Sequence, residues 1–327
     1  MRVQPSAAVL VLAGIVAPAV TQSSDAGLLA SLRREGASRF ADFLESDPST
    51  LDAFLRNART VYAPSDESLA RPRRRDDTTQ RLQQANYQGC QAETNLAAGS
   101  MSLPGRSEQT MLVAPKLQPQ PITDSVSQKL GNSSLQVIVA DSRPDNTKRW
   151  LSRSLVQRRQ SAQSWPKLCS GLGATTNIMR GGIKFDRGTI YLTDGYFTLP
   201  QSISRTVNAI GQTTFASLAA IGGLTQQLDD MHAVTIFLPS NTALASVQAG
   251  NMSGSAAAQL ASSHIVPNFV GYLPRLRDGA NMRSQTGQVL KVRVVGGKYY
   301  INDAAITQAN IILDSGVAHV IDKSRSR

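Results

Sequence analysis

The sequence predicts two tandem copies of one domain that contains both helices and strands. Residues 291–322 hold three short runs of mainly β-branched side chains, separated by residues 296–297 and 314–316. The alternation within the runs and the turn residues between them predict a small antiparallel sheet. A similar ending, with a turn at 186–188 before a β-branched run at 189–194, closes the middle of the chain. A repeated ending indicates a repeated domain.

Residues 1–19 predict a cleaved secretory signal peptide. Arg2 supplies a positive start, residues 7–20 form an apolar stretch, and residues 17–19 offer small side chains for cleavage. The apolar stretch is too short to span a bilayer comfortably, since a span needs about 20 apolar residues. No second apolar run follows and the final residues are polar. We therefore expect a secreted protein without a transmembrane or GPI anchor, with a vacuolar lumen as the alternative location.

Each predicted module begins with helices and continues into a strand and a proline turn. Residues 27–59 and 206–229 carry apolar side chains at helical spacing. The segments TVYAPSDESL (60–69) and VTIFLPSNTAL (234–244) then each predict a strand, a turn and a further helix. In the first copy, Ser65 or Asp66 is expected to cap that helix.

The boundary between the modules is predicted at a polar turn near residues 200–205. We assign residues 23–203 to the first module and 204–327 to the second. The first module is longer because it holds a polar stretch at 71–110 and a basic one at 143–167, which we expect to be irregular loops.

The formal charge of +11 comes mostly from arginine, while aromatic residues make up 5% of the chain. A nucleic-acid surface would interleave basic side chains with stacking aromatics, so we expect no nucleic-acid partner. A secreted basic protein is better suited to acidic polysaccharide, cell wall or an acidic protein. Simple solvation of the arginine clusters is an equal alternative.

Cys90 and Cys169 are the two cysteines of the chain, and Asn132 and Asn251 begin glycosylation sequons. In an oxidising compartment the cysteines are candidates for a disulfide, which would stabilise the fold by roughly 4–5 kcal/mol in the chain-entropy model. Two buried thiols are the alternative. The sequons predict glycosylation at the surface.

Three histidines, His232, His264 and His319, are the strongest candidates for chemistry. They stand far apart and belong to no metal-binding or nucleophile motif, so we predict no catalytic residues, no metal site and no cofactor. His319 lies in an apolar strand and is expected to be a hydrogen-bonded structural residue. An enzyme whose site is assembled by folding around His264, with His319 and Asp322, is the minority alternative.

Three segments of the second module resemble the signatures of the fasciclin I (FAS1) family. VTIFLPSNTALASV resembles the opening signature, SSHIVP the central one with His264 at the signature histidine, and IILDSGVAHVID the closing one. The first module has the similar segments TVYAPSDESL and KLGNSSLQVIVADS but no histidine. The resemblance implies an α+β fold of two FAS1-like domains, each a compact β-wedge or sandwich surrounded by helices.

The resemblance also implies a non-catalytic interaction protein. In filamentous fungi, secreted FAS1 proteins are encoded beside multicopper or flavin oxidases that couple aromatic polyketides into pigments or toxins, so we expect an accessory to such an oxidase. Adhesion or cell-wall association, with a wall glycan as partner, is the alternative. A Tyr-His pair is tied to integrin binding in some animal members, but here Ser263 precedes His264. We expect an apolar pocket between sheet and helices of the second module, with His264, Phe269 and Tyr272 as binding residues.

Overall fold

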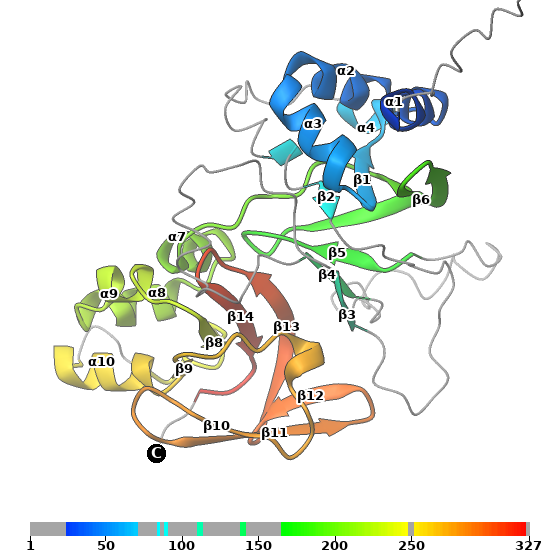
Figure 1. The fold of residues 1–327 in the computed structure, drawn as a ribbon. Helices are drawn as coiled ribbons and strands as arrows, with labels where there is room; N and C mark the ends of the chain where they lie inside the picture. Colours follow the sequence, from blue (N-terminus) through cyan, green and yellow to red (C-terminus); the bar gives the residue numbers. More distant parts are fainter. Residues whose placement is uncertain are drawn as a thin grey trace, which may run out of the picture.

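Two seven-stranded sheets, each with its own helices, form the body of the protein (Figure 1). The structure is a computed structural model that describes residues 24–70, 84–85, 88–90, 110–113, 138–141, 165–247 and 252–324. The first sheet has the strand order β2-β1-β7-β6-β5-β4-β3, and the second has the order β10-β11-β12-β13-β14-β8-β9. The predicted α+β class with two tandem modules is confirmed.

Each module begins with helices that lead into a strand, as the sequence predicts. In the first module the elements are α1 (Ser24–Arg34), α2 (Ser38–Ser46), α3 (Pro48–Asn57), β1 (Thr60–Pro64), α4 (Asp66–Leu69), β2 (Gly89–Cys90), β3 (Thr110–Val113), β4 (Ile138–Asp141), β5 (Lys167–Cys169), β6 (Thr175–Phe185) and β7 (Gly188–Thr193). In the second they are α7 (Ile203–Ala209), α8 (Thr213–Ile221), α9 (Thr225–Asp229), β8 (Val234–Pro239), α10 (Gly254–Ser262), β9 (Ile265–Val266), the 3-10 helix η3 (Leu273–Arg275), β10 (Asn281–Arg283), β11 (Val289–Val295), β12 (Lys298–Ile301), β13 (Ala304–Ile312) and β14 (Gly316–Ile321).

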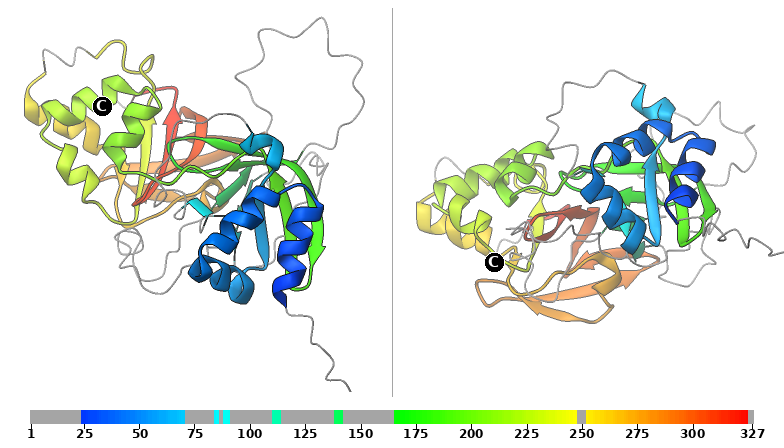
Figure 2. Two further views of the ribbon diagram at one scale, coloured as in Figure 1. Left: turned by 90° about the horizontal axis from the view of Figure 1, so that it is seen from above. Right: turned by 45° about the horizontal axis from the view of Figure 1, so that its top comes forward.

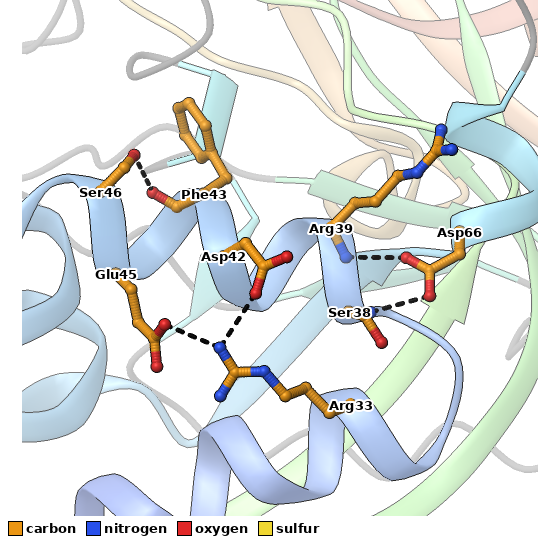
Figure 3. Close-up of polar contacts among 8 residues, drawn as sticks. All are labelled: Arg33, Ser38, Arg39, Asp42, Phe43, Glu45, Ser46 and Asp66. Atoms are coloured by element: carbon orange, nitrogen blue, oxygen red, sulfur yellow. Dashed lines mark hydrogen bonds and ion pairs between the residues drawn. The ribbon is translucent and has the colours of Figure 1, made fainter.

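Polar contacts fix the start of the first module. Ser65 accepts the Ser68 N–H and caps α4, as predicted, whereas Asp66 caps α2 instead by accepting the N–H groups of Ser38 and Arg39 (Figure 3). Capping satisfies backbone donors that the first turn of a helix leaves open. Arg33 reaches from α1 to carboxylates on α2 and ties the two helices together at their surface.

Each sheet buries one face under its helices. The opposite face of the first sheet packs against a loop that contains Phe197, and that of the second sheet is covered by strands of the same sheet. The apolar sides of α1, α2 and α3 pack on β1 and β7, and α7 to α10 pack on β8, β13 and β14. Figure 2 shows the two helical groups at separate ends of the molecule. The second sheet curls so that β10, β11 and β12 close a further apolar cluster against β8.

The pairing of the closing strands corrects one prediction. The run at residues 317–321 lies in β14, which pairs in parallel with β8 as well as antiparallel with β13. The first module repeats this arrangement, because β1 pairs in parallel with β7. The predicted small antiparallel sheet is therefore right for β11 and β12 but incomplete for β14. The segment after Pro239, expected to be helical, forms turns up to residue 246.

The structure does not join the two cysteines in the candidate disulfide. Cys90 points into the cluster around Tyr62 and Tyr191, while Cys169 points to the opposite side, toward the second module. Side chains on alternate faces of a sheet cannot meet without rearrangement of the backbone. The predicted signal peptide at residues 1–19 and the sequons at Asn132 and Asn251 lie outside the described residues.

Candidate functional site

His264, at the central signature of the second module, lies between α10 and the sheet with 1% of its surface exposed. Its Nδ1 donates to the carbonyl oxygen of Leu260 at 2.8 Å, and the hydroxyl of Ser263 lies 3.1 Å from the same nitrogen. Its ring meets the ring of Phe215 edge to face, with centroids 6.5 Å apart. These contacts hold α10 on the core.

His319 lies on β14 and points to the other side of the same sheet. Its Nδ1 accepts the Asn310 N–H at 3.3 Å, so the proton sits on Nε2, which donates to the carbonyl oxygen of Gly271 at 2.9 Å. The ring stacks on Phe237 with centroids 5.7 Å apart. The prediction of a hydrogen-bonded structural histidine agrees with this geometry.

Folding does not assemble the residues named for an enzymatic site. His264 packs with Phe215 in the cluster under the helices, and His319 packs with Phe237 in the cluster on the opposite face of the sheet. Asp322 accepts the Ala305 N–H at the edge of the sheet. A nucleophile or base must lie within hydrogen-bond reach of its partner, and these three side chains face different environments.

Phe269 belongs to a loop at residues 267–272 that hydrogen bonds hold in place. The Thr235 hydroxyl donates to the carbonyl oxygen of Phe269 at 2.6 Å and accepts the Gly271 N–H at 2.8 Å. Asn310 accepts the Leu273 N–H at 3.0 Å. The Phe269 ring is half-buried against the cluster that β10, β11 and β12 close. Phe269, expected to be a binding residue, is therefore part of a packed loop.

Tyr272 ends this loop and lies between the two modules. It is 2% exposed and packs with Val139 and Cys169 of the first module and with Ile312 and Val317 of the second. Burial raises the pKa of its phenol, an effect that the nearby Arg275 partly opposes. Its hydroxyl has no hydrogen-bond partner among the residues that the structure describes. Tyr272 is thus brought against the first module and is separated from His264.

Further contacts extend this junction between the modules. Gly171 forms an isolated parallel bridge with Ile312, and Gln201 forms another with Leu313. The carbonyl oxygen of Gln201 also accepts the Asp314 N–H at 3.1 Å. The sequence gives no local signal for these contacts, because they depend on how the modules dock.

An open pocket of about 370 Å³ lies on the first module, where the β7 end meets the start of β6. Hydroxyl, amide and carboxylate groups dominate its lining, which is formed by Gln84, Ala174, Thr175, Thr176, Asp194, Gly195, Tyr196 and Thr198. Asn177 donates its backbone N–H and its side-chain amide to the Asp194 carboxylate, at 2.9 and 2.6 Å, and so orients it. Our sequence reasoning missed these residues because they form no motif. The corresponding space between sheet and helices in the second module, where we expected an apolar pocket, is packed with core side chains.

Among the residues that the structure describes, no group of three or more histidine, cysteine, aspartate or glutamate side chains is placed to hold a metal ion. Within the same part of the chain, no helix is both long and apolar enough to cross a membrane.

Comparisons with known proteins point to one family. The family model described as the fasciclin domain matches residues 211–324. A fasciclin-like arabinogalactan protein of Arthroderma benhamiae is 31% identical over 46% of this chain and 36% of its own length. The fasciclin-like arabinogalactan protein CTB11 of Cercospora beticola is 31% identical over 47% of this chain and 42% of its own length. The matched segments thus span less than half of either relative.

A solved structure gives a further likeness. The FAS1 domain pair of the insect cell adhesion molecule fasciclin I aligns with a TM-score of 0.39 and 14% identity, over 90% of this chain and 98% of that chain.

Proposed function

We propose that the chain belongs to the FAS1 family, whose domain model matches residues 211–324, and that it is a secreted, non-catalytic interaction protein. Its specific role is to assist a secreted multicopper or flavin oxidase that couples aromatic polyketides. The oxidase removes one electron and one proton from each of two phenols, and the two radicals then form one new bond. The oxidase's own copper or flavin would accept these electrons. This chain supplies binding and orientation.

The observation that supports this proposal is the use of the candidate polar residues in packing. His264 and His319 are buried and hydrogen-bonded to backbone groups on opposite faces of the second sheet. Tyr272 is buried at the junction between the modules. Since these groups maintain the fold, the chemistry is assigned to a partner protein. Similarity to fasciclin-like proteins of two fungi supports the fungal setting of the proposal.

The assistance is proposed to act through protein–protein contact. A site for an apolar aromatic ligand is usually a cavity lined by hydrophobic and aromatic side chains. The lining of the pocket on the first module is instead mainly polar, with threonine hydroxyls, an amide and the Asp194 carboxylate beside one aromatic residue, Tyr196. Such a lining suits a hydroxyl-rich molecule better than a polyketide radical. The oxidase itself is therefore the partner that we propose.

Affinity capture of the tagged full chain from its own secretion fluid, followed by mass spectrometry, tests this function. We expect stoichiometric recovery of an oxidase, and deletion of this chain should stall the coupling reaction. An unrelated secreted protein with the same tag and a similar pI of about 10.0 serves as the control for charge-driven carry-over. An empty capture, together with conversion of a phenol by the chain alone, would overturn the proposal and indicate an enzyme.

Cell-wall association is the second candidate, and the polar pocket of the first module favours it. Hydroxyl and amide groups around Thr175 and Thr176 can exchange hydrogen bonds with a sugar. If this function is correct, capture recovers wall glycans, and Thr175→Val lowers retention on wall material because it removes one hydroxyl from the pocket. Retention that Thr175→Val leaves unchanged would exclude the pocket as the glycan site.

Secretion is part of both proposals and rests on the N-terminal apolar stretch of the sequence. N-terminal sequencing of the protein recovered from culture medium tests it. A mature terminus close to residue 20 is expected, and retention of Met1 would contradict cleavage.

A further inference from the structure

The outer face of the β10–β12 ribbon carries a row of basic side chains. Along β11, Leu290 and Val292 are buried, while Lys291 and Arg293 point outward and are exposed. On the neighbouring strands, Arg283 and Lys298 are also exposed. Alternation along each strand therefore puts four cations on one solvent-facing surface. We call these residues, Arg283, Lys291, Arg293 and Lys298, the basic ribbon.

Strand register sets the spacing within the basic ribbon. Lys291 and Arg293 are two residues apart on β11, which corresponds to about 7 Å along the strand. Arg283 lies opposite Val289, diagonal to Lys291, and Lys298 lies opposite Val295, diagonal to Arg293. Diagonal neighbours are about 7–8 Å apart across a strand pair. The cations thus form a continuous row across three strands, with the half-buried Tyr300 opposite Arg293.

The charge of this row is not neutralised within the described residues. None of the ion pairs between those residues includes a member of the basic ribbon. Three carboxylates of the second module keep their charge but form no ion pair with the ribbon within the described residues: Asp278 accepts the Val294 N–H, Asp303 pairs with Lys323, and Asp322 accepts the Ala305 N–H. Four neighbouring like charges repel one another, and a bound polyanion relieves that repulsion.

We propose that the basic ribbon is a binding surface for an extended acidic polysaccharide. A linear polymer with repeated negative charge can follow a row of cations spaced along an open sheet face. Single-stranded nucleic acid would need several stacking aromatics, and Tyr300 is the aromatic residue that the three strands present on this face. Insertion into a membrane surface would need several large apolar or aromatic side chains, whereas this face exposes two valines, Val289 and Val295, beside the half-buried Tyr300. The surface acts independently of the proposed oxidase partner.

Retention of the full chain on immobilised polygalacturonate tests this surface, with dextran, single-stranded DNA and phosphatidylserine vesicles as comparison probes. We expect polygalacturonate to be preferred and binding to weaken as salt rises from about 50 to 500 mM, because salt screens exposed charges. The triple variant Lys291→Gln/Arg293→Gln/Lys298→Gln should bind polygalacturonate at least roughly tenfold more weakly than the parent protein. Its thermal midpoint should stay close to that of the parent protein, since the three side chains are exposed.

A charge-matched variant separates the basic ribbon from net charge. Arg34→Gln/Arg56→Gln/Arg205→Gln removes three exposed arginines elsewhere and should keep binding within about threefold of the parent protein. An equal loss in both variants would overturn the proposal in favour of non-specific attraction. Unchanged binding by the ribbon variant, no binding by the parent protein, or tighter binding to DNA or vesicles would overturn it as well.

Discussion

Tyr272 illustrates how a residue with a reactive-looking side chain can serve packing. Its ring fills the junction between the modules, and its hydroxyl is buried with no hydrogen-bond partner in the described part of the chain. His264 and His319 also act through contacts with backbone groups, since each binds a carbonyl oxygen. At the scale of single residues, the signature histidine and the nearby tyrosine are therefore assigned to stability.

Two substitutions of Tyr272 test this assignment. Tyr272→Phe should leave the free energy of unfolding unchanged or raise it by up to about 1 kcal/mol, because it removes an unsatisfied hydroxyl. Tyr272→Ala should lower it by about 3–5 kcal/mol, because it opens a cavity at the junction. Urea denaturation measures both. A loss of more than about 1 kcal/mol in the phenylalanine variant would show that the hydroxyl makes a stabilising contact.

The state of the two cysteines gives a second prediction at this scale. Burial raises the pKa of the Cys90 thiol to about 12, so the reactive thiolate is scarce in the folded protein. We expect almost no reaction of Cys90 with a thiol reagent at pH 8 in the native state. In denaturant without reductant, two thiols per chain should react. Detection of no thiols under those conditions would show that Cys90 and Cys169 are paired after all.

At the scale of elements, the parallel pair at the centre of each sheet depends on a glycine. A Cβ on Gly316 would lie 1.9 Å from the carbonyl oxygen of Val234, and one on Gly188 would lie 1.9 Å from that of Arg59. Both glycines open the closing strand directly after a turn. This shared requirement explains why the two modules have similar endings.

Replacement of either glycine should separate the parallel pair. Gly316→Ala and Gly188→Ala are each expected to lower the free energy of unfolding by about 2–4 kcal/mol, because the backbone must shift to relieve the overlap with the neighbouring segment of the chain. Gly287→Ala is the control, since its Cβ meets nothing within 4 Å and only the φ of 82° is unfavourable. That control should cost about 1 kcal/mol. Equal costs for all three variants in thermal unfolding would contradict the account.

The start of α3 provides a test of pH dependence. Asp47 accepts the Thr50 N–H at 3.1 Å, and hydrogen bonding from Thr50 holds the pKa of Asp47 below its usual range, against the effect of partial burial. A carboxyl group with a lowered folded-state pKa stabilises the protein above its unfolded pKa of about 3.9. That contribution is lost as the pH falls through the folded-state value.

Asp47→Ala should therefore lower the free energy of unfolding by about 1 kcal/mol at pH 7. This difference in stability from the parent protein should shrink below about pH 4. Thermal unfolding across this pH range measures it. Asp52→Ala, which removes only the exposed ion pair with Arg56, should cost no more than about 0.5 kcal/mol at pH 7. A difference for Asp47→Ala that stays constant with pH would argue against the ionised cap.

For the whole molecule, local sequence patterns predicted where helices and strands lie better than they predicted which strands pair with each other. Helical spacing at residues 27–59 and 206–229 found α1–α3 and α7–α9, and the β-branched runs found β1, β7, β8, β11, β12 and β14, because these signals lie within a few residues of one another. Strand β13 was harder to define, since its middle is polar and irregularly paired. The parallel pairing of β8 with β14 joins segments about 80 residues apart, which periodicity does not encode.

The candidate site shows the same limit. His264, Phe269 and Tyr272 lie close together in the sequence and were predicted to form one binding site. In the fold, their side chains lie in three different environments. The pocket around Asp194 and the basic ribbon depend on strand register and on which face is buried. Alternation along β11 was visible in the sequence, but its outward direction became clear only once Leu290 and Val292 were placed in the core.

A reconstituted coupling assay tests whether this chain binds and orients while a partner protein performs the chemistry. The products formed from a phenolic substrate are measured with the purified chain alone, with the captured oxidase alone, and with both together. We expect no conversion by the chain alone and more dimeric product with both proteins than with the oxidase alone. Conversion by the chain alone, or identical products with and without it, would contradict the account.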